Sequence, residues 1–356
     1  MEFMSPFLSI LCFIDETLLP ALNPIGQLIK LLYNWIGSYG WTVVLFTVFL
    51  KMLTLPLDYW QKLVMKRNSV KMEEMKPLLA NIDKQYGHDQ RKANEEKSKL
   101  NKKYGYSVAA SCLPMIITLV VFFFMLSGIN SYTSYISKRD YLLLNDAYNV
   151  AFDEAIAGGD GEYAAIEKGK DAVAEAYGDT VQEKFLWIKN IWRPDTWSAP
   201  MTDVNTFYKE LPEAEKALFR KEKYILLYES VTENYPGYFS KTGADGKPTA
   251  GWNGLLILPI LAIVLSFLST FLMQKQSKAS VSAEPDPTQQ SNKMMMFLMP
   301  IMMGVFAFIY TAAFALYMVS NSLLSILANF VMQPIIDRKV AKEKITAAPQ
   351  ASYKRQ

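Results

Sequence analysis

The chain has 356 residues, of which 51% are hydrophobic and 20% are charged, and its formal net charge is +3. These averages describe a mixture of long apolar stretches and highly charged segments. A single histidine, His88, and two cysteines, Cys12 and Cys112, leave almost no residues for zinc binding or for Cys/His nucleophilic catalysis. We therefore expect no metal site and no cofactor.

The first 39 residues suggest two elements. Residues 1–20 contain a short apolar run without a basic start or small residues at a cleavage site, which indicates an uncleaved or degenerate leader. Residues 21–39 carry an apolar stripe opposed by polar side chains, which favours an amphipathic helix in the membrane interface. A helix that packs on protein would show the same stripe.

The first predicted span covers residues 40–57, GWTVVLFTVFLKMLTLPL, which is near the minimum length for crossing a bilayer. At helical spacing its Thr47, Lys51 and Thr54 fall on one face. A charge at this depth costs at least ~2.5–3.5 kcal/mol, and no Asp or Glu lies within the other predicted spans. An unpaired cation beside two hydroxyls suggests a water-filled cavity. Snorkelling of Lys51 to the interface is the alternative.

Residues 58–107 form a charged segment with twelve basic and seven acidic side chains. By the positive-inside rule this segment is cytoplasmic, so the first span runs from outside to inside. A helical hairpin is predicted, with a break at Gly87–His88–Asp89 and a second helix from about Gln90 to Lys103. Interleaved aromatic residues are lacking, so no specific nucleic-acid sequence is expected as a partner.

The second predicted span, residues 108–129, returns the chain to the outside, and residues 130–251 form an extracytoplasmic domain. This domain has fourteen basic and twenty acidic side chains, so it is acidic where the hairpin is basic. Helices are predicted over Asp146–Lys184, interrupted at Gly158–Gly161, and over Glu213–Asn234. The acidic residues indicate a solvated surface rather than paired catalytic carboxylates.

The third predicted span covers residues 252–273, and a polar cytoplasmic loop, residues 274–293, follows it. The apolar stretch 294–336 is too long for one span, because a helix of that length would measure ~65 Å. It is predicted as two spans joined by a turn near Tyr310–Phe314. Residues 337–356 form a basic cytoplasmic tail. The sequence thus predicts an all-α membrane protein with five transmembrane helices, its N-terminus outside and its C-terminus cytoplasmic.

Polar side chains recur every four residues in the fifth predicted span, at Tyr317, Asn321, Ser325 and Asn329. Two interpretations fit these side chains equally well: hydrogen bonds between helices, or a hydrated cavity. The presence of Lys51 favours the cavity. The fourth span is rich in methionine, which suits varied apolar partners or ordinary helix packing. Its methionines are Met294, Met295, Met296, Met299, Met302 and Met303.

Several stretches carry a family resemblance, in this order. They are the first span with its Leu-Pro-Leu ending, the hairpin and second span from KMEEMKPLL to SCLPMIITLVVFFF, the external motif FLWIKNIWRPDTW, and the later spans LILPILAIVLSF and ALYMVSNSLLSI. Together they resemble the YidC/Oxa/Alb family of membrane protein insertases. The groove cation of that family is usually arginine, so Lys51 keeps the charge but loses the forked donor geometry.

The resemblance implies an insertase or chaperone in the bacterial plasma membrane, which needs no covalent chemistry and is not an enzyme. Such a protein moves polar segments of nascent membrane proteins through a hydrophilic groove and releases their apolar spans into the lipid bilayer. The implied groove is lined by Thr47, Lys51, Thr54, Tyr317, Asn321 and Ser325. The implied receiver of substrate, of the ribosome or of the Sec translocon is the cytoplasmic hairpin, with Met72, Met75, Pro77, Tyr86 and Tyr104, together with the basic tail.

Two other classes of protein stay open. A small-anion transporter would use Lys51 as its binding cation, although no internal repeat of the kind common in transporters is found. A receptor that works through its extracytoplasmic domain would lose function on deletion of Asp140–Lys184. An insertase would tolerate much of that deletion if Phe185–Trp197 remained.

Overall fold

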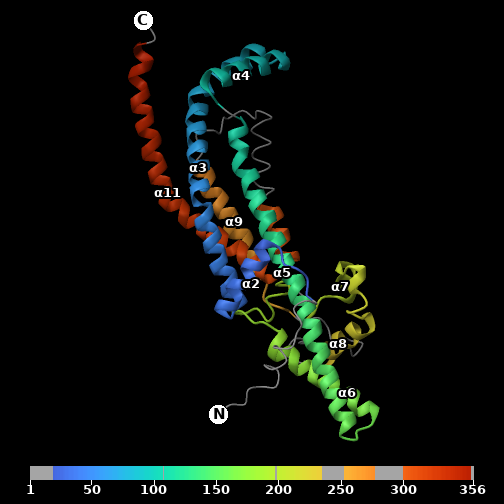
Figure 1. Cartoon of the computed structure of the whole chain (residues 1–356). Coiled ribbons are helices and arrows are strands. Elements are labelled where there is room, and N and C mark those ends of the chain that lie inside the picture. Colours follow the sequence, from blue (N-terminus) through green and yellow to red (C-terminus); the bar gives the residue numbers. More distant parts are fainter. Residues whose placement is uncertain (1–18, 107, 197–198, 235–251, 277–299, 354–356) are drawn as a thin grey trace. The chain divides into compact units, whose positions relative to one another are not determined.

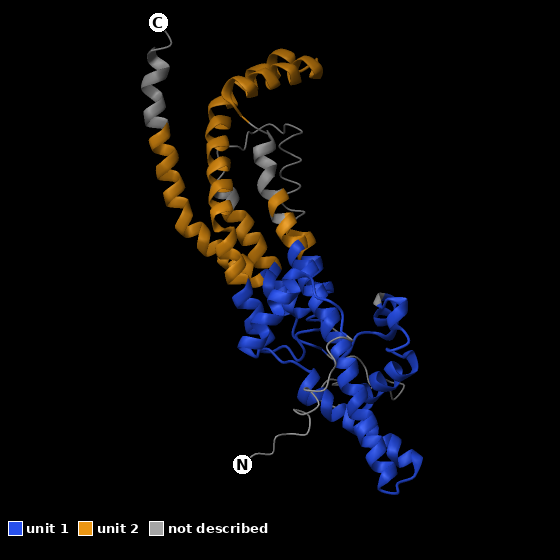
Figure 2. Cartoon of the chain, in the orientation of Figure 1, with its two compact units in different colours: residues 1–46, 124–262, 304–318 blue, residues 47–123, 263–303, 319–356 orange. Residues whose placement is uncertain are grey.

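The structure is a computed structural model that describes residues 19–106, 108–196, 199–234, 252–276 and 300–353. Within these ranges the chain is helical apart from turns, loops and isolated bridge residues, among them the antiparallel pair Phe185 and Ile188, so the all-α prediction is confirmed there. The chain divides into two compact units (Figure 2). Unit 1 comprises residues 1–46, 124–262 and 304–318, and unit 2 comprises residues 47–123, 263–303 and 319–356.

The helices are labelled in Figure 1. In chain order they are α2 Pro24–Ile36, α3 Tyr39–Tyr86, α4 Gln90–Tyr104, α5 Val108–Ala157, α6 Glu162–Ala176, α7 Val204–Glu210, α8 Lys221–Asn234, α9 Ile257–Gln276 and α11 Ala312–Tyr353. A single π-helical turn, η2, covers Tyr177–Val181, a 3₁₀ turn, η3, covers Glu213–Glu215, and a short apolar helix, Pro300–Ile309, precedes α11.

The α2 helix confirms the helix predicted within residues 21–39. The side chain of Asn23 caps its first turn by accepting a hydrogen bond from the Gly26 amide at 2.7 Å. One side of α2 packs on α5, where Ile25 lies against Gly128. A Cβ added to Gly128 would lie only 2.3 Å from Cγ2 of Ile25. Leu31 and Trp35 are exposed on the same helix. Packing on protein therefore accounts for part of the stripe, and the membrane-interface position stays a prediction.

The first predicted span and the first helix of the hairpin form one helix. The α3 helix runs unbroken for 48 residues and contains Pro56 and Pro77. The predicted boundary at residue 57 is therefore not a helix end, although proline removes one backbone donor at each of these positions. The predicted break at residues 87–89 is confirmed, because α3 ends at Tyr86. The Asp89 side chain then caps α4.

The second predicted span likewise continues into the polar segment, since α5 is 50 residues long. The predicted interruption at Gly158–Gly161 is confirmed, and Gly159 adopts a left-handed φ of 90° there. Two predicted helix ranges were too long. The α6 helix ends at Ala176 and a π-helical turn follows it, so the helix does not reach Lys184, and α8 begins at Lys221 rather than at Glu213.

Unit 1 contains an aromatic core that the last half of α5 shares with α6, α7 and α8. The rings of Phe207 and Tyr224 stack with centroids 4.3 Å apart, and the Phe219 and Tyr141 rings meet edge to face at 5.1 Å. Such aromatic pairs add to the stabilisation from burial alone. The buried members are Tyr141, Leu144, Ala147, Tyr148, Val173, Ala176, Tyr177, Val181, Met201, Phe207, Leu211, Phe219, Tyr224, Leu227 and Val231.

The third predicted span begins later than expected, because residues 252–256 are bound to an upstream loop. The side-chain Nδ2 of Asn253 donates to the backbone carbonyls of Asn190, Arg193 and Pro194 at 2.7, 3.0 and 2.9 Å. Helix α9 therefore starts at Ile257 rather than at Trp252.

The buried carboxylate of Asp195 holds the start of α9. It accepts hydrogen bonds from the Leu256 and Leu258 amides at 3.2 and 3.0 Å, and so satisfies donors that a helix N-terminus leaves unpaired. Burial raises the pKa of the Asp195 carboxyl above its usual value, while the Leu258 and Leu256 amides oppose that rise. The aspartate of the Arg-Pro-Asp sequence thus serves as a cap from a distant part of the chain.

We expect Asp195→Ala to lower the free energy of unfolding by about 2–4 kcal/mol, because two charge-assisted hydrogen bonds are lost and the amides stay buried. Asp203→Ala is the matched control, since Asp203 caps α7 at an exposed position and its loss should cost only about 1 kcal/mol. Thermal unfolding of both variants in detergent measures the difference. Equal melting temperatures for the two would contradict this role of Asp195.

The predicted turn near Tyr310–Phe314 is confirmed, because the short helix ends at Ile309 and α11 begins at Ala312. The first amides of α11 donate to loop carbonyls, Ala312 to Arg193 at 2.8 Å and Ala313 to Ile191 at 3.1 Å. Helix α11 then continues to Tyr353, well past the predicted end of the fifth span.

Among the described residues, three helices are long and apolar enough to cross a membrane: α3, α5 from Leu119 to Ala157, and α11 from Ala312 to Glu343. Two shorter apolar helices, Ile257–Leu272 and Pro300–Ile309, coincide with the third and fourth predicted spans. Five membrane crossings therefore stay a prediction.

Candidate functional site

The charged site in unit 2 is centred on Lys51 of α3. Its Nζ donates a hydrogen bond to Oδ2 of Asp58 at 2.7 Å and to Oγ of Ser325, on α11, at 2.9 Å. The Lys51 side chain is only 13% exposed and that of Asp58 22%. An ammonium group, a carboxylate and a hydroxyl therefore meet between α3 and α11.

The prediction that Lys51 is unpaired was wrong. Asp58 lies seven residues further along α3, about two helical turns, so both side chains project from the same face. The predicted end of the first span at residue 57 places Asp58 in the cytoplasmic segment, outside the spans in which a counter-ion is expected. The seven-residue spacing was the signal that could have revealed this ion pair.

The other predicted groove residues in unit 2 lie on the same two helices. Thr47 is buried, and the hydroxyl of Thr54 donates to the Lys51 carbonyl oxygen at 3.2 Å. Asn321 lies one turn before Ser325 on α11 and is half-buried. Tyr317 is buried as well, but it belongs to unit 1. Its place in a common groove with the other residues stays a prediction.

The fourth polar residue of the predicted repeat, Asn329, is 2% exposed, and neither its Oδ1 nor its Nδ2 has a hydrogen-bond partner among the described residues. The Nε2 of Gln61, on α3, is also buried without such a partner. Buried amide groups usually find a partner or an ordered water. Unit 2 therefore contains polar groups beyond Lys51 that water could hydrate.

We expect Asn329→Leu to keep the fold and to raise the free energy of unfolding by about 1–3 kcal/mol, because an unpaired amide is replaced by an apolar side chain of similar size. Ser322→Ala is the control, since the Ser322 hydroxyl pairs with Ser266 at 3.3 Å and its loss should be neutral or destabilising. Thermal unfolding in detergent distinguishes them. A clear loss of stability in Asn329→Leu would show that water or another group satisfies the amide.

Further toward the C-terminal ends of both helices, α3 and α11 pack along each other. The apolar contact consists of Leu63 on α3 with Met332, Ile336 and Val340 on α11. Two ion pairs flank it, Lys66 with Asp337 at 2.8 Å and Arg67 with Glu343 at 2.6 Å. The beginning of the predicted basic tail is thus a helix docked on α3, which sequence reasoning did not detect.

The predicted cytoplasmic hairpin is formed by the end of α3 and by α4. Lys97 pairs with Asp83 at 2.7 Å, and the Lys71 ammonium donates to the Gly105 carbonyl at 2.6 Å, so charged contacts join the two helices as expected. Ala93 of α4 is buried. The named hairpin residues differ in exposure: Met75 is buried, Pro77 is exposed, and Met72, Tyr86 and Tyr104 are half-buried.

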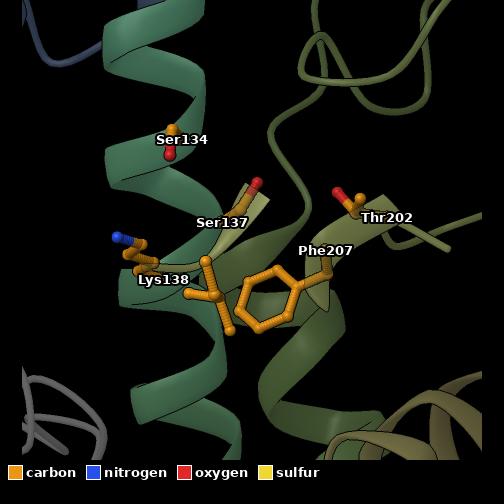
Figure 3. A pocket seen from close by; sticks show the side chains of 6 residues that line it. Ser134, Ser137, Lys138, Thr202 and Phe207 are labelled. Atoms are coloured by element: carbon orange, nitrogen blue, oxygen red, sulfur yellow. The ribbon is translucent and has the colours of Figure 1, made fainter. Parts of the chain in front are cut away.

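Unit 1 contains a small hollow beside the aromatic core. Figure 3 shows Ser134, Ser137 and Lys138 on one helix, with Thr202 and Phe207 across from them. The Lys138 ammonium is already paired with the Glu215 carboxylate. The described residues contain no group of three or more His, Cys, Asp or Glu side chains that could hold a metal. The hollow offers no evident chemistry.

Two of the six methionines predicted for the fourth span lie among the described residues. Met302 and Met303 are half-buried. The other four methionines lie outside the described residues, as do most of the predicted loop 274–293 and residues 1–18 of the predicted leader.

These features define the class: an all-helical integral membrane protein with a charged site within its apolar helices. The chain belongs to the 60Kd inner membrane protein family, whose family model matches residues 31–339. This is the YidC/Oxa/Alb family, so the resemblance noted in the sequence is confirmed. The family and the apolar helices indicate a protein of the bacterial inner membrane.

Three relatives illustrate the similarity. The chain is 32% identical over 31% of its length to the membrane protein insertase YidC of Caldanaerobacter subterraneus, and 23% identical over 86% to that of Leptospira interrogans. It is 23% identical over 87% of its length to the chloroplastic ALBINO3-like protein 1 of Arabidopsis thaliana. The alignments cover 52%, 33% and 46% of these relatives, respectively.

Proposed function

We propose that this chain is a membrane protein insertase that accepts a polar segment of a nascent membrane protein at Lys51 and releases the adjoining apolar span into lipid. The observation that carries the proposal is the contact of Lys51 with Asp58 and Ser325, a polar site between two helices otherwise suited to lipid. Relatives named insertases support it. No covalent chemistry is needed.

The proposed mechanism is an exchange of counter-ions. In the resting protein Asp58 neutralises Lys51 and reduces the cost of holding an ammonium group at this depth. An acidic residue of the incoming segment would replace Asp58, with an attraction of ~4 kcal/mol at 4 Å and an effective dielectric of ~20. Burial of the following apolar span in lipid then supplies the drive that completes insertion.

The groove is proposed to be lined by Thr47, Lys51, Thr54, Asn321 and Ser325, with Tyr317 added from the sequence alone. The buried side-chain amides of Gln61 and Asn329, which have no protein partner among the described residues, lie on the same two helices as this lining. A hydrated groove reduces the distance over which a polar segment must cross hydrocarbon. This is the physical benefit that an insertase provides.

The proposed orientation follows the charge pattern, with the basic α3–α4 hairpin and the end of α11 in the cytoplasm and residues 130–251 outside. The hairpin and the end of α11 are proposed to receive nascent chains, the ribosome or the Sec translocon. The docked helices α3 and α11 would then join this receiving end to the Lys51 site.

The direct test is reconstitution of the purified chain into liposomes, followed by a small single-span substrate with an acidic external tail. Protease protection of that tail reports insertion, and empty liposomes are the control. Flux of chloride and phosphate in the same vesicles tests the small-anion transporter. Insertion without flux supports the proposal, whereas flux without insertion, from a protein shown to be folded, would replace it with the transporter.

A further inference from the structure

An apolar patch is exposed at one end of unit 1, on two neighbouring segments that precede α9. Its members are Leu186 and Trp187 in the turn Phe185–Ile188, and Trp252 and Leu255 just before the helix. Leu186 is 68% exposed and Leu255 66%. We call these four residues the Leu-Trp patch. Large apolar side chains gathered on a surface in this way indicate a contact with another apolar phase or partner.

Backbone hydrogen bonds hold the patch in place. The turn is closed by the Phe185 amide donating to the Ile188 carbonyl at 3.0 Å and by the reverse bond at 2.9 Å. The next residue, Lys189, donates its amide to the Asn253 carbonyl at 2.8 Å, which ties the turn to the second segment. Gly254 packs so closely that a Cβ there would lie 2.6 Å from Cδ1 of Ile188. The four side chains thus belong to one ordered surface.

The backbone at Leu186 is unusual for a leucine, with a left-handed φ of 53°. A side chain with a Cβ pays an energetic cost in this region that glycine avoids and that asparagine reduces. The Leu186 side chain does not recover this cost by packing inside the protein, because most of it is exposed. Strained positions of this kind point to a role outside the fold itself.

The patch lies where two apolar helices begin. The Phe185 ring contacts the first turn of α3, with its centroid 5.7 Å from that of Trp41, and it leaves no room for a Cβ on Gly40. Leu255 comes two residues before the start of α9. The ends of membrane-spanning helices are the level at which Trp side chains favour the boundary between head groups and hydrocarbon.

We propose that the Leu-Trp patch inserts into the outer-leaflet interface of the bilayer and anchors the turn Phe185–Ile188 on lipid. Lys184, exposed directly before the turn, would face the anionic head groups. Trp41, which the Phe185 ring contacts, and Ile260 in the first turn of α9 are exposed as well, which favours lipid over a separate protein partner. This inference requires that α3 and α9 cross the bilayer and that residues 130–251 lie outside, the orientation proposed above, and it does not rest on the insertase mechanism.

The test places a fluorescent probe at the patch in a chain that lacks its native cysteines, Cys12→Ser and Cys112→Ser. Leu186→Cys and Leu255→Cys are labelled with the environment-sensitive dye NBD. Tyr163→Cys is the matched control, because Tyr163 is 78% exposed on α6, away from the patch. The proteins are reconstituted in vesicles of phosphatidylcholine and phosphatidylglycerol. Quenching is measured with head-group-proximal doxyl lipid and with iodide on both sides of the membrane.

We expect the probes at residues 186 and 255 to be quenched by doxyl lipid at least about threefold more strongly than the control, and to be shielded from iodide. Strong iodide quenching without lipid quenching at both positions would overturn the proposal. Shielding from both quenchers would also overturn it, because a second copy or another segment of this chain would then cover the patch.

A second measurement uses the unaltered chain, in case a labelled variant fails to fold. Photolysis of a lipid that carries a diazirine near its head group, followed by mass spectrometry, maps the residues that lipid touches. We expect label on residues 185–188 and 252–255 and not on residues 162–168 of α6. Absence of label from both patch segments, with label present on α3 and α9, would refute lipid contact.

Discussion

Replacing Lys51 by leucine is expected to slow insertion of a substrate with an acidic tail by at least about tenfold. The attraction of ~4 kcal/mol between Lys51 and a substrate carboxylate is partly offset by the loss of the Lys51–Asp58 attraction. A net gain of only ~1.4 kcal/mol in the rate-limiting step corresponds to the factor of ten. Lys51→Arg keeps the charge, so its rate should stay close to that of the wild type. Protease protection in liposomes measures all three rates.

Asp58 provides the control that separates the charge from the fold. Lys51→Leu leaves the Asp58 carboxylate without its 2.7 Å partner, which costs stability in its own right. The double variant Lys51→Leu/Asp58→Asn removes that problem and should be as slow as Lys51→Leu. Asp58→Asn alone should insert the acidic tail as fast as the wild type or faster, because the substrate no longer competes with Asp58.

A different result would reject the counter-ion exchange. If Asp58→Asn were as inactive as Lys51→Leu, the ion pair itself would be needed, and Lys51 would be a structural residue. If all variants inserted normally, Lys51 would have no part in insertion, although the chain could still be an insertase that relies on its apolar surfaces.

Local sequence signals predicted much of the fold. The breaks at residues 87–89 and 158–161 follow from glycine and turn-forming residues, whose backbone preferences act over a few positions. The turn near Tyr310–Phe314 follows instead from length, because the apolar stretch 294–336 is too long for one span. The positions of the apolar helices were also predicted, because a run of hydrophobic residues is a signal that lies within the helix itself.

Contacts between segments that are far apart in the chain could not be predicted from such local signals. The start of α9 at Ile257 depends on Asp195 and Asn253, which are about sixty residues apart in the chain. The docking of α3 on α11 joins residues near 66 with residues near 337. Periodicity shows that a helix has an apolar face, but it does not identify the element that covers that face.

The candidate site was predicted as a set of residues but not as an arrangement. Thr47, Lys51 and Ser325 were singled out, and the structure brings Lys51 and Ser325 into contact. The role of Asp58 was missed because a boundary was drawn between residues 57 and 58, where α3 in fact continues. Its seven-residue spacing from Lys51 became informative only once the helix was known to be continuous.

The second large effect is expected in the aromatic core of unit 1, where Phe219→Ala should lower the free energy of unfolding by about 3–5 kcal/mol. Phe219 is fully buried, and its ring packs on those of Tyr141 and Phe207. The neighbouring Leu218 is 40% exposed, so Leu218→Ala should change stability by no more than about 0.5 kcal/mol. Limited proteolysis over a temperature series reports unfolding of this domain.

This pair of variants separates the insertase from the receptor more cleanly than a deletion of Asp140–Lys184 does. That deletion would remove Tyr141, Tyr177 and Val181 from the core, and would leave the apolar faces of α7 and α8 uncovered. Its failure would therefore reflect misfolding in either case. At a temperature where the Phe219→Ala domain is unfolded and the Leu218→Ala domain is folded, an insertase whose working site is Lys51 should still insert its substrate. A receptor that works through this domain would lose its function.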